Sequence, residues 1–340
     1  YSDEIYGKEK SGRYVCESRL DKMLSKEYDL LIERLSTARG DNSHFFAFAN
    51  TVATGDQKKR FSHGWMGVRF QTKDGGPSND IILHVRLLDK HRLLQQEALG
   101  ILGVNLIHAA FRHLKNPEHI VQALVDNLKD GQVSIDMLKF QGPDTKHINN
   151  HLMNLELVRR GLSDAILFGP DQNILNVSDE LFKKTILIQR GTYKPVTNTH
   201  LDVLEKGLSQ FKKDSPEDKK NILVLFELTM HNLQQDGHLH EKDFLDRVKS
   251  LCLLGHHVLV SNFFLFYRLK HYLRAYTDKP MVLIFGASHL DRLFDEKHYT
   301  DLDGGLLEGL GKLLDKSTKL YVYPHKTQQT CMTTKTFFPE

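Results

Sequence analysis

The chain has 340 residues, 40% of them hydrophobic and 26% charged, and its 46 basic and 43 acidic residues leave a net charge of +3. This hydrophobic content excludes an intrinsically disordered chain. The near balance of charge gives no sign of the clustered basic surface that nucleic-acid-binding proteins carry, so we expect no nucleic-acid partner.

The spacing of the cysteines and the hydropathy of the chain indicate the cellular compartment. The three cysteines, Cys16, Cys252 and Cys331, lie far apart and have neither disulfide-framework nor metal-ligand spacing, which favours a reducing environment. No apolar run is long enough to span a bilayer, and no secretory signal follows Tyr1. Short basic runs such as Lys58-Lys59-Arg60 are typical of a solvated surface. We therefore expect a cytoplasmic protein without a membrane partner.

The first half of the chain predicts a mixture of helices and strands. Apolar residues at helical spacing predict a helix over residues 18–35, which the Arg-Gly-Asp-Asn stretch at 39–42 ends. Three closely spaced runs rich in Phe, Val and Ile follow, and they predict a partly antiparallel sheet because no helix separates them. These runs cover residues 44–52, 64–71 and 81–88. Beyond them we expect a helix over 92–114, a helix that begins near Pro117, a strand over 133–140, a helix over 148–160 and a strand over 164–168.

From about residue 185, strands and helices alternate regularly. The strands are predicted over residues 185–189, 222–228, 257–260, 281–285 and 320–323, and the main helices between them over 199–211, 241–254 and 264–275. Short, continuously apolar strands that alternate with helices are typical of a parallel sheet covered on both faces.

We therefore predict an α/β protein of two domains. Residues 1–180 would form a mixed α+β domain, or an extension of the sheet, whose role the sequence does not show. Residues 181–340 would form a Rossmann-like, doubly wound parallel sheet.

One turn of the second half has a composition suited to binding phosphate. It follows the first strand of the regular region and reads Gly-Thr-Tyr-Lys-Pro-Val-Thr-Asn-Thr-His over residues 191–200. Gly191 lets the backbone turn tightly and approach a ligand, and Pro195 stiffens the turn before a helix. Thr197 and His200 place a hydroxyl and an imidazole on one face of the first helical turn, beside the positive end of the helix dipole. Since ligands bind at this edge of parallel sheets, we expect an anion site here.

This segment resembles the first signature of the nicotinamide/nicotinate mononucleotide adenylyltransferases. In that family a strand is followed by Gly-x-Phe-x-Pro, then by His or Thr, two further residues and His. The matching residues are Gly191, Tyr193 (in place of Phe), Pro195, Thr197 and His200. The resemblance covers residues 185–211 and implies that His200 stabilises charge on the α-phosphate of ATP and the leaving pyrophosphate, assisted by Thr197 and the backbone of Gly191 and Thr192. Mg²⁺ would be held mainly by the phosphates, without a dedicated set of protein ligands.

The family's second signature, Ser-Ser/Thr-Thr-x-x-Arg at a helix start, has a degenerate counterpart at residues 287–292. Ser288 and Arg292 have the spacing to contact the β- and γ-phosphates, whereas Ala287 and His289 depart from the pattern. Over its whole length the chain also resembles a family whose members carry inconsistent names, among them that of a TonB-dependent receptor.

Further polar groups lie at strand ends of the regular region. Glu227 is in the strand over residues 222–228, and Asn262 follows the strand over 257–260. Glu227 would either contact a ribose hydroxyl or a metal-bound water, or only order its loop, and we include both residues among the candidate ligand-binding groups. Arg190, directly before the turn, would either neutralise phosphate or pair with an acidic neighbour.

The first half also contains polar residues within strand-like runs. His63, Arg69, His84 and Arg86 alternate along two of the runs, where they would form either a basic patch for an anionic ligand or the solvent face of a sheet. Asp136 lies in an apolar run and is therefore either paired or functional. The 19 histidines contain no HExxH signature, and we assign no metal-ligating residue.

Three hypotheses of function remain open. The leading one is an enzyme that transfers an adenylyl group from Mg-ATP to a pyridine mononucleotide, with His200, Thr197 and Arg292 in the catalytic role. The second is a non-catalytic nucleotide- or protein-binding α/β module. The third is a hydrolase or phosphoribosyl-type enzyme that uses Glu227, Asp136 and histidines. The first requires Thr197, His200, Ser288 and Arg292 to converge on one cleft.

Overall fold

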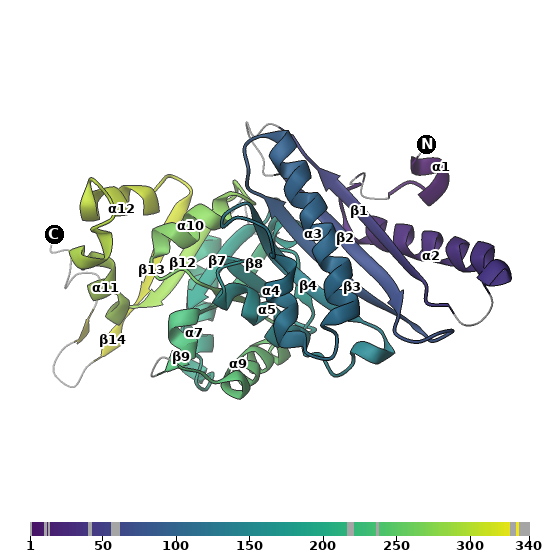
Figure 1. Ribbon diagram of the computed structural model, residues 1–340. Coiled ribbons are helices and arrows are strands. Elements are labelled where there is room, and N and C mark those ends of the chain that lie inside the picture. Colours follow the sequence, from purple (N-terminus) through teal and green to yellow (C-terminus); the bar gives the residue numbers. More distant parts are fainter. Residues whose placement is uncertain are drawn as a thin grey trace. The chain divides into compact units, whose positions relative to one another are not determined.

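The computed structural model describes residues 2–9, 12, 14–39, 43–55, 62–215, 221–235, 238–326 and 331–332. The chain divides into two compact units, Tyr1–Asp164 and Ala165–Glu340 (Figure 1). This division lies earlier than the expected boundary near residue 180, because β5 (Ala165–Phe168) pairs with a strand of the second sheet. Residues 40–42 and 58–60 and the side chain of Cys331, all discussed above, lie outside the described part of the chain.

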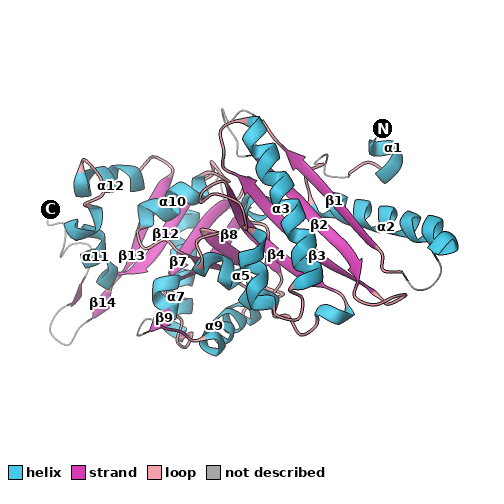
Figure 2. Cartoon of the chain, viewed as in Figure 1, coloured by secondary structure: helices cyan, strands magenta, loops and turns pink. Residues whose placement is uncertain are grey.

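The first unit contains a four-stranded antiparallel sheet of its own, shown in magenta in Figure 2. Its strands follow one another in the order β1-β2-β3-β4. They are β1 (Phe46–Ala53), β2 (Ser62–Gln71), β3 (Ser78–Leu87) and β4 (Val133–Gln141). The expectation of antiparallel pairing is confirmed, since every neighbouring pair runs antiparallel.

Helices cover both faces of this sheet. On one face, α3 (Arg92–Arg112), α4 (Ile120–Leu124) and α5 (Asn150–Arg159) pack their apolar residues against Met66, Val68, Leu83 and Val85. On the other, α2 (Glu17–Arg39) lies so close that a Cβ on Gly67 would meet the Leu24 side chain at 2.9 Å. Successive side chains of each strand point to opposite faces of the sheet, and helices bury both faces.

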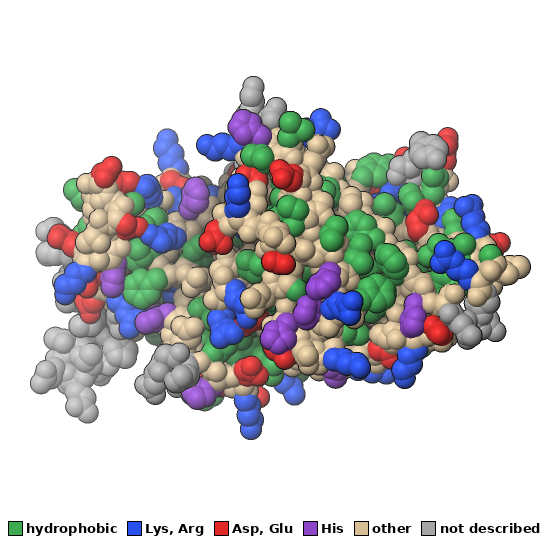
Figure 3. All heavy atoms as spheres, viewed as in Figure 1, with side chains coloured by type: hydrophobic (Ala, Val, Ile, Leu, Met, Phe, Trp, Pro, Cys, Tyr) green, Lys and Arg blue, Asp and Glu red, His purple; other side chains and the backbone are tan. Residues whose placement is uncertain are grey.

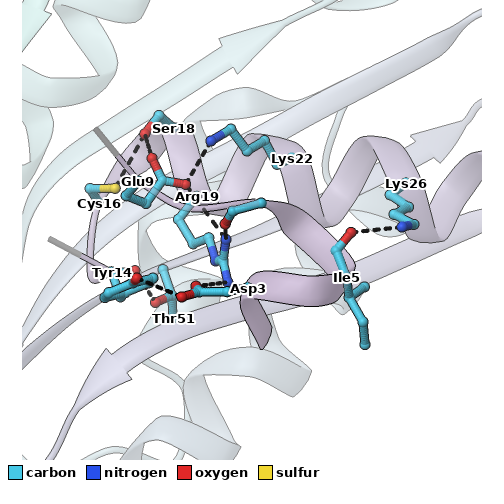
Figure 4. A network of polar contacts seen from close by, with 11 residues as sticks. Asp3, Ile5, Glu9, Tyr14, Cys16, Ser18, Arg19, Lys22, Lys26 and Thr51 are labelled. Atoms are coloured by element: carbon cyan, nitrogen blue, oxygen red, sulfur yellow. Dashed lines mark hydrogen bonds and ion pairs between the residues drawn. The ribbon is translucent and has the colours of Figure 1, made fainter. Parts of the chain in front are cut away.

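A buried arginine attaches the short α1 (Ser2–Tyr6) to α2 (Figure 4). Arg19 is 2% exposed, and its guanidinium donates to the Gly7 carbonyl at 2.6 Å and lies 3.7 Å from both Asp3 and Glu9. The same guanidinium lies over the ring of Tyr6 at 5.2 Å. A hydrogen bond from Lys22 lowers the pKa of the Glu9 carboxyl, so Glu9 stays charged opposite Arg19.

Hydrophobic side chains gather on part of the outer surface over α3 (Figure 3). Leu93, Val104 and Phe111 of this helix are exposed, and Phe46 of β1 packs edge-on against Phe111. Even so, none of the described helices combines the length and the hydropathy needed to cross a membrane.

The second unit contains a seven-stranded, mostly parallel sheet in the order β13-β12-β7-β8-β11-β5-β6. The five parallel strands are β7 (Thr185–Arg190), β8 (Ile222–Thr229), β11 (His257–Ser261), β12 (Met281–Gly286) and β13 (Thr318–Tyr323). β5 and β6 (Ile174–Leu175) extend one edge in antiparallel pairing. In chain order, β8 and β11 extend the sheet on one side of β7. β12 and β13 then extend it on the other side of β7. The order of the sheet therefore reverses between β7 and β12, as it does in Rossmann-like folds.

Helices cover both faces of this sheet, which confirms the predicted doubly wound arrangement. α10 (Phe266–Arg274) packs on one face with Ile188, Leu225 and Leu283. α7 (Asn198–Asp214) lies on the other, where a Cβ on Gly207 would meet Ile284 at 2.1 Å, and α9 (Glu241–Leu253) contacts β11. The remaining elements are α6 (Val177–Leu181), α8 (Met230–Leu233), β9 (Gln234–Gln235), β10 (His238–Leu239), η1 (Pro117–His119), η2 (Pro143–Thr145), η4 (Ala287–His289), α11 (Leu290–Phe294), η5 (Glu296–Tyr299), α12 (Gly305–Leu313), β14 (His325–Lys326) and β15 (Cys331–Met332).

The packing of α3 predicts a stability effect. Leu102 is 0% exposed within the core of the first unit, so Leu102→Ala should lower the free energy of unfolding by about 2–5 kcal/mol in urea titration. On the same helix Val104 is 67% exposed, and Val104→Ala should change that free energy by less than about 0.5 kcal/mol. Equal effects of the two substitutions would contradict the assignment of the buried face.

Candidate functional site

The carboxyl ends of β7, β8, β11 and β12 meet at one edge of the second sheet, beside the reversal of strand order. A helix start follows each of these ends: α7 after β7, α8 after β8, α10 after β11, and η4 with α11 after β12. Parallel sheets bind ligands in this position because the strand ends and helix N-termini present unpaired backbone groups there.

The turn after β7 is built around a buried aromatic residue. Tyr193 is 1% exposed, and its hydroxyl donates to the Gln189 carbonyl at 2.6 Å. Its ring packs against Phe226 with centroids 5.2 Å apart. A Cβ on Gly191 would lie 2.7 Å from this ring, so the glycine is needed for packing inside the protein. Pro195 follows a cis Lys194–Pro195 peptide bond and is exposed.

The backbone of the turn is held by hydrogen bonds. The Gly191 amide donates to the Glu227 carbonyl at 3.2 Å, and the Gly191 carbonyl accepts from Asn232 at 3.4 Å. The Thr192 carbonyl accepts from the buried guanidinium of Arg247 at 3.0 Å. The amide of Gly191, which we expected to assist at a phosphate, is therefore occupied within the sheet.

Thr197 and His200 form a capping box at the start of α7. The Thr197 amide donates to Nδ1 of His200 at 3.0 Å, so the neutral imidazole carries its proton on Nε2. Burial lowers the pKa of His200, which keeps the ring neutral near pH 7. The ring lies 4.9 Å from that of Tyr193. His200 is thus a structural cap that also presents one N–H donor at a helix N-terminus.

Arg190 and Glu227 form a buried ion pair across β7 and β8. The guanidinium binds the carboxylate through two hydrogen bonds, of 2.8 and 2.9 Å. It also donates to the backbone carbonyls of Phe263 and Phe264 at 2.9 and 2.7 Å. Ser261 donates to Glu227 at 2.6 Å. Of the two alternatives for Arg190, the structure shows the pairing with an acidic neighbour, and Glu227 is engaged by Arg190 and Ser261.

A small pocket opens at this edge of the sheet. Its polar lining comes from Arg190, Thr229, His231, Asn232, His289 and Arg292, with Phe266 and Tyr299 among its apolar walls. No acidic side chain is among the described residues that line it. The cavity is about 40 Å³, far below the roughly 300–1,000 Å³ of typical small-molecule pockets. Its chemistry and size suit a single anionic group.

Of the candidate residues whose side chains the structure describes, Arg190 and Arg292 line this pocket. Arg292 is exposed and makes no hydrogen bond or ion pair to the described part of the chain. Asn262 is exposed outside the pocket, and the side chain of Ser288 lies outside the described residues. His231 and His289 were not expected. His289 lies within the degenerate second signature, whereas His231 follows a strand end, which is its only signal in the sequence.

Two buried atoms near this edge lack hydrogen-bond partners. Nδ1 of His289 has none, and burial together with the nearby Arg292 and Arg190 lowers the pKa of His289. Oε1 of Gln189 also has none, while its amide nitrogen donates to the His200 carbonyl at 3.0 Å. A buried polar atom without a hydrogen-bond partner lowers the stability of the fold unless a ligand or a water molecule supplies that partner.

Comparison of the chain with family models, with curated proteins and with solved structures finds no match in any of the three. Within the described residues, no group of three or more His, Cys, Asp or Glu side chains is placed to hold a metal ion. Assignment of the site therefore rests on its own geometry.

The polar residues expected in the first half fall into two groups. Arg69 binds Asp80 through two hydrogen bonds of 2.8 Å and also contacts Ser25 of α2. His63, His84 and Arg86 gather around Asp136 instead, so the four basic residues do not form one patch.

Breaking the Arg190–Glu227 pair should strongly destabilise the second unit. Glu227→Gln leaves the Arg190 guanidinium, 8% exposed, without its counter-charge, and we expect the free energy of unfolding to fall by about 3–5 kcal/mol in urea titration. Glu205→Gln, at an exposed position of α7, is the matched control and should change it by less than about 0.5 kcal/mol. A similarly small effect of Glu227→Gln would rule out a stabilising role for the pair.

The histidines of the second unit predict a loss of stability in mild acid. Burial lowers the pKa of His200, His256, His257 and His289 below the ordinary value of 6.5. Between pH 6.5 and the lower pKa of the folded state, the unfolded chain binds more protons than the folded chain. The free energy of unfolding therefore falls as the pH drops through 6.5. We expect a lower urea midpoint at pH 5 than at pH 7.5, and a smaller difference for His200→Gln. Equal midpoints would contradict the burial of these rings.

Proposed function

We propose that the second unit is a nucleotidyltransferase-like domain that transfers an adenylyl group from Mg-ATP to a pyridine mononucleotide. One observation carries the proposal. The two segments that resemble the adenylyltransferase signatures leave β7 and β12, which are neighbouring parallel strands, with Gln189 beside Ile284 in register. Both segments therefore start at one edge of the sheet, where its strand order reverses and nucleotides bind in Rossmann-like folds.

The side chains at this edge have suitable chemistry. Nε2–H of His200 would donate to a phosphate oxygen at the start of α7, with the Thr197 hydroxyl beside it. Arg292, which has no partner in the described chain, would neutralise a second phosphate in the small pocket. Because the pocket holds only one anionic group, the ribose and base would lie along the open edge outside it. Mg²⁺ would be bound mainly by the phosphates.

One unpartnered acceptor supports a ligand with hydrogen-bond donors. Oε1 of Gln189 needs an N–H or O–H group, which a nucleoside supplies through its ribose hydroxyls and base amines. Nδ1 of His289 donates or accepts according to the tautomer of its ring, so a phosphate or a nucleoside can pair with it. A fully ionised phosphate alone would leave Oε1 of Gln189 unpaired, and a nucleotide therefore fits the site better than an inorganic anion.

A non-catalytic nucleotide-binding module is the second candidate. The capping box by itself explains why Thr197 and His200 stand three residues apart, without any catalytic role. A cytoplasmic location also belongs to this proposal, supported by Cys16 and Cys252, which form no disulfide within the described residues.

The test is an assay with Mg-ATP and each pyridine mononucleotide, scored by formation of dinucleotide and pyrophosphate. We expect product and a rise in melting temperature with ATP. His200→Ala should then lower kcat/KM by an amount equivalent to about 2.7–4 kcal/mol, because one preorganised donor is lost.

Two further variants separate catalysis from folding. Arg292→Ala removes no hydrogen bond from the described protein, so it should weaken ATP binding without lowering the melting temperature. His271→Ala, at an exposed position of α10, should leave both unchanged. A melting temperature that rises with ATP without product would favour the binding module. No product and no thermal shift would refute both candidates.

A further inference from the structure

The two edges of the sheet in the first unit differ. Its outer strands are β1 and β4, since the strand order is β1-β2-β3-β4 (Figure 1). A strand at an edge presents a row of backbone N–H and C=O groups that have no neighbouring strand. Proteins usually block such a row, because it can pair with a strand of another chain.

The edge of β4 is closed by side chains of α5. The Asn154 side chain donates to the Leu138 carbonyl at 2.5 Å and accepts from the Leu138 amide at 2.9 Å. Asn150 makes the same two contacts with the backbone of Phe140, at 3.0 and 2.8 Å. Asn154 is 0% exposed. The two asparagines therefore take the place of a neighbouring strand.

The edge of β1 has no such cover among the described residues. The Gln71 amide donates to the Phe45 carbonyl at 3.1 Å, so the odd-numbered residues of β1 bond to β2 in the alternating antiparallel pattern. The N–H and C=O groups of the even-numbered residues point outward. These residues are Phe46, Phe48, Asn50 and Val52. No described residue forms a hydrogen bond with their outward groups.

β1 also lacks the features that usually protect an edge strand. It reads Phe-Ala-Phe-Ala-Asn-Thr-Val-Ala and contains neither a charged residue nor a proline. It pairs with β2 over all eight residues without a bulge. Phe46 of β1 and the neighbouring Phe111 of α3 are 43% and 44% exposed. An apolar surface therefore lies beside the open row of backbone groups.

We propose that β1 is the interface of a two-fold homodimer, in which the β1 strands of two copies pair antiparallel and join their sheets. Because the outward groups belong to even-numbered residues, the hydrogen-bonded pairs join even-numbered residues of the two copies. A register centred on Ala49 places Phe48 opposite Asn50 of the second copy. In the same register Phe46 lies opposite Val52 of the second copy. A two-fold axis at Ala49 generates both halves of this pairing.

The face of the sheet under α3 gains apolar burial in this dimer. The even-numbered side chains point to this face, since a Cβ on Gly103 of α3 would meet the Phe48 ring at 3.0 Å. The exposed Phe46 would there be covered by Val52 of the second copy. Hydrogen bonds that replace bonds to water contribute little net free energy, so this apolar contact is expected to supply much of the affinity.

The face of the sheet under α2 offers no obstacle. Ala49 lies opposite Gly67, whose Cβ would meet Leu24 of α2, so the odd-numbered side chains of β1 point to this face. Those near the axis are alanines and Thr51, which are small. The Thr51 hydroxyl donates to the Tyr14 carbonyl at 2.6 Å, a contact that uses none of the outward backbone groups.

A second copy suits this edge better than a separate peptide does. A peptide strand added to β1 would present a new open edge on its own far side. A second copy ends instead in its own β4, whose edge Asn150 and Asn154 close. β1 carries no charge, so two copies of it do not repel each other. The proposal concerns the first unit and does not depend on nucleotidyl transfer.

The oligomeric state in sedimentation equilibrium tests the pairing, and we expect the native chain to be a dimer. Asn50→Pro removes one outward N–H but no bond to β2, and proline is tolerated at such edge positions. It should raise the dissociation constant at least about tenfold, because both copies lose that hydrogen bond. Asn50→Ala keeps the N–H group and is the matched control, which should remain a dimer.

Three outcomes of this experiment would overturn the proposal. A native chain that is monomeric at every concentration has no such interface. A dimer that Asn50→Pro and Asn50→Ala leave equally strong is held together elsewhere. An assembly larger than a dimer contradicts the closed two-fold pairing.

Hydrogen exchange of single amides gives a second readout on the unaltered chain. In the dimer the Phe48 amide should exchange about as slowly as the Ala49 amide, which bonds to β2. Dilution below the dissociation constant should speed exchange at Phe48 at least about tenfold and leave Ala49 protected. Protection of Ala49 in Asn50→Pro would show that the sheet of the variant is intact. A Phe48 amide that is protected in a monomer, or unprotected in a dimer, would refute the pairing.

Discussion

The buried ion pair between Arg190 and Glu227 organises the edge of the second sheet on which the candidate site depends. One guanidinium joins the end of β7 to β8 through Glu227 and reaches the loop after β11 through two backbone carbonyls. Its flat face lies 4.1 Å from the ring centre of Phe266 at the start of α10. Because arginine has several donors in a fixed plane, a single side chain sets the positions of three strand ends and one helix start.

The two sheets place polar groups by different means. In the second unit, parallel pairing brings several strand ends to one edge, so residues far apart in the sequence meet there. In the first unit, antiparallel pairing sets His84 beside Trp65 on the middle of a face, and one extra residue in β4 adds Asp136 to them. Both arrangements bury charge next to apolar packing, and in both an arginine balances the carboxylate.

The turn after β7 shows why motif residues are open to two explanations. Gly191 makes room for the Tyr193 ring, and His200 caps α7 through its Nδ1. Each of these contacts stabilises the turn without any ligand. The same contacts also leave Nε2–H of His200 as a donor at the helix start, so the structural role and the proposed phosphate contact are compatible.

The sequence by itself determined the elements and their classes. Apolar runs in the second half predicted a parallel sheet with helices on both faces, and closely spaced strands in the first half predicted antiparallel pairing. Local periodicity carries this information because each element buries one face of its own. The sequence also showed the polar turn over Gly191–His200, which follows an apolar strand. It likewise showed Glu227 and Asp136 as acidic residues within apolar runs.

Only the tertiary structure decided how those residues are used. Whether Glu227 faces a ligand or Arg190, and whether Asp136 is paired, depends on strand order and register, which bring together residues 37 and 52 positions apart. The bulge at Asp136 changes a register by one residue without any mark in the sequence. The boundary near residue 165 likewise follows from the pairing of β5 with β11, since a short apolar strand is compatible with either sheet until its hydrogen-bond partner is known.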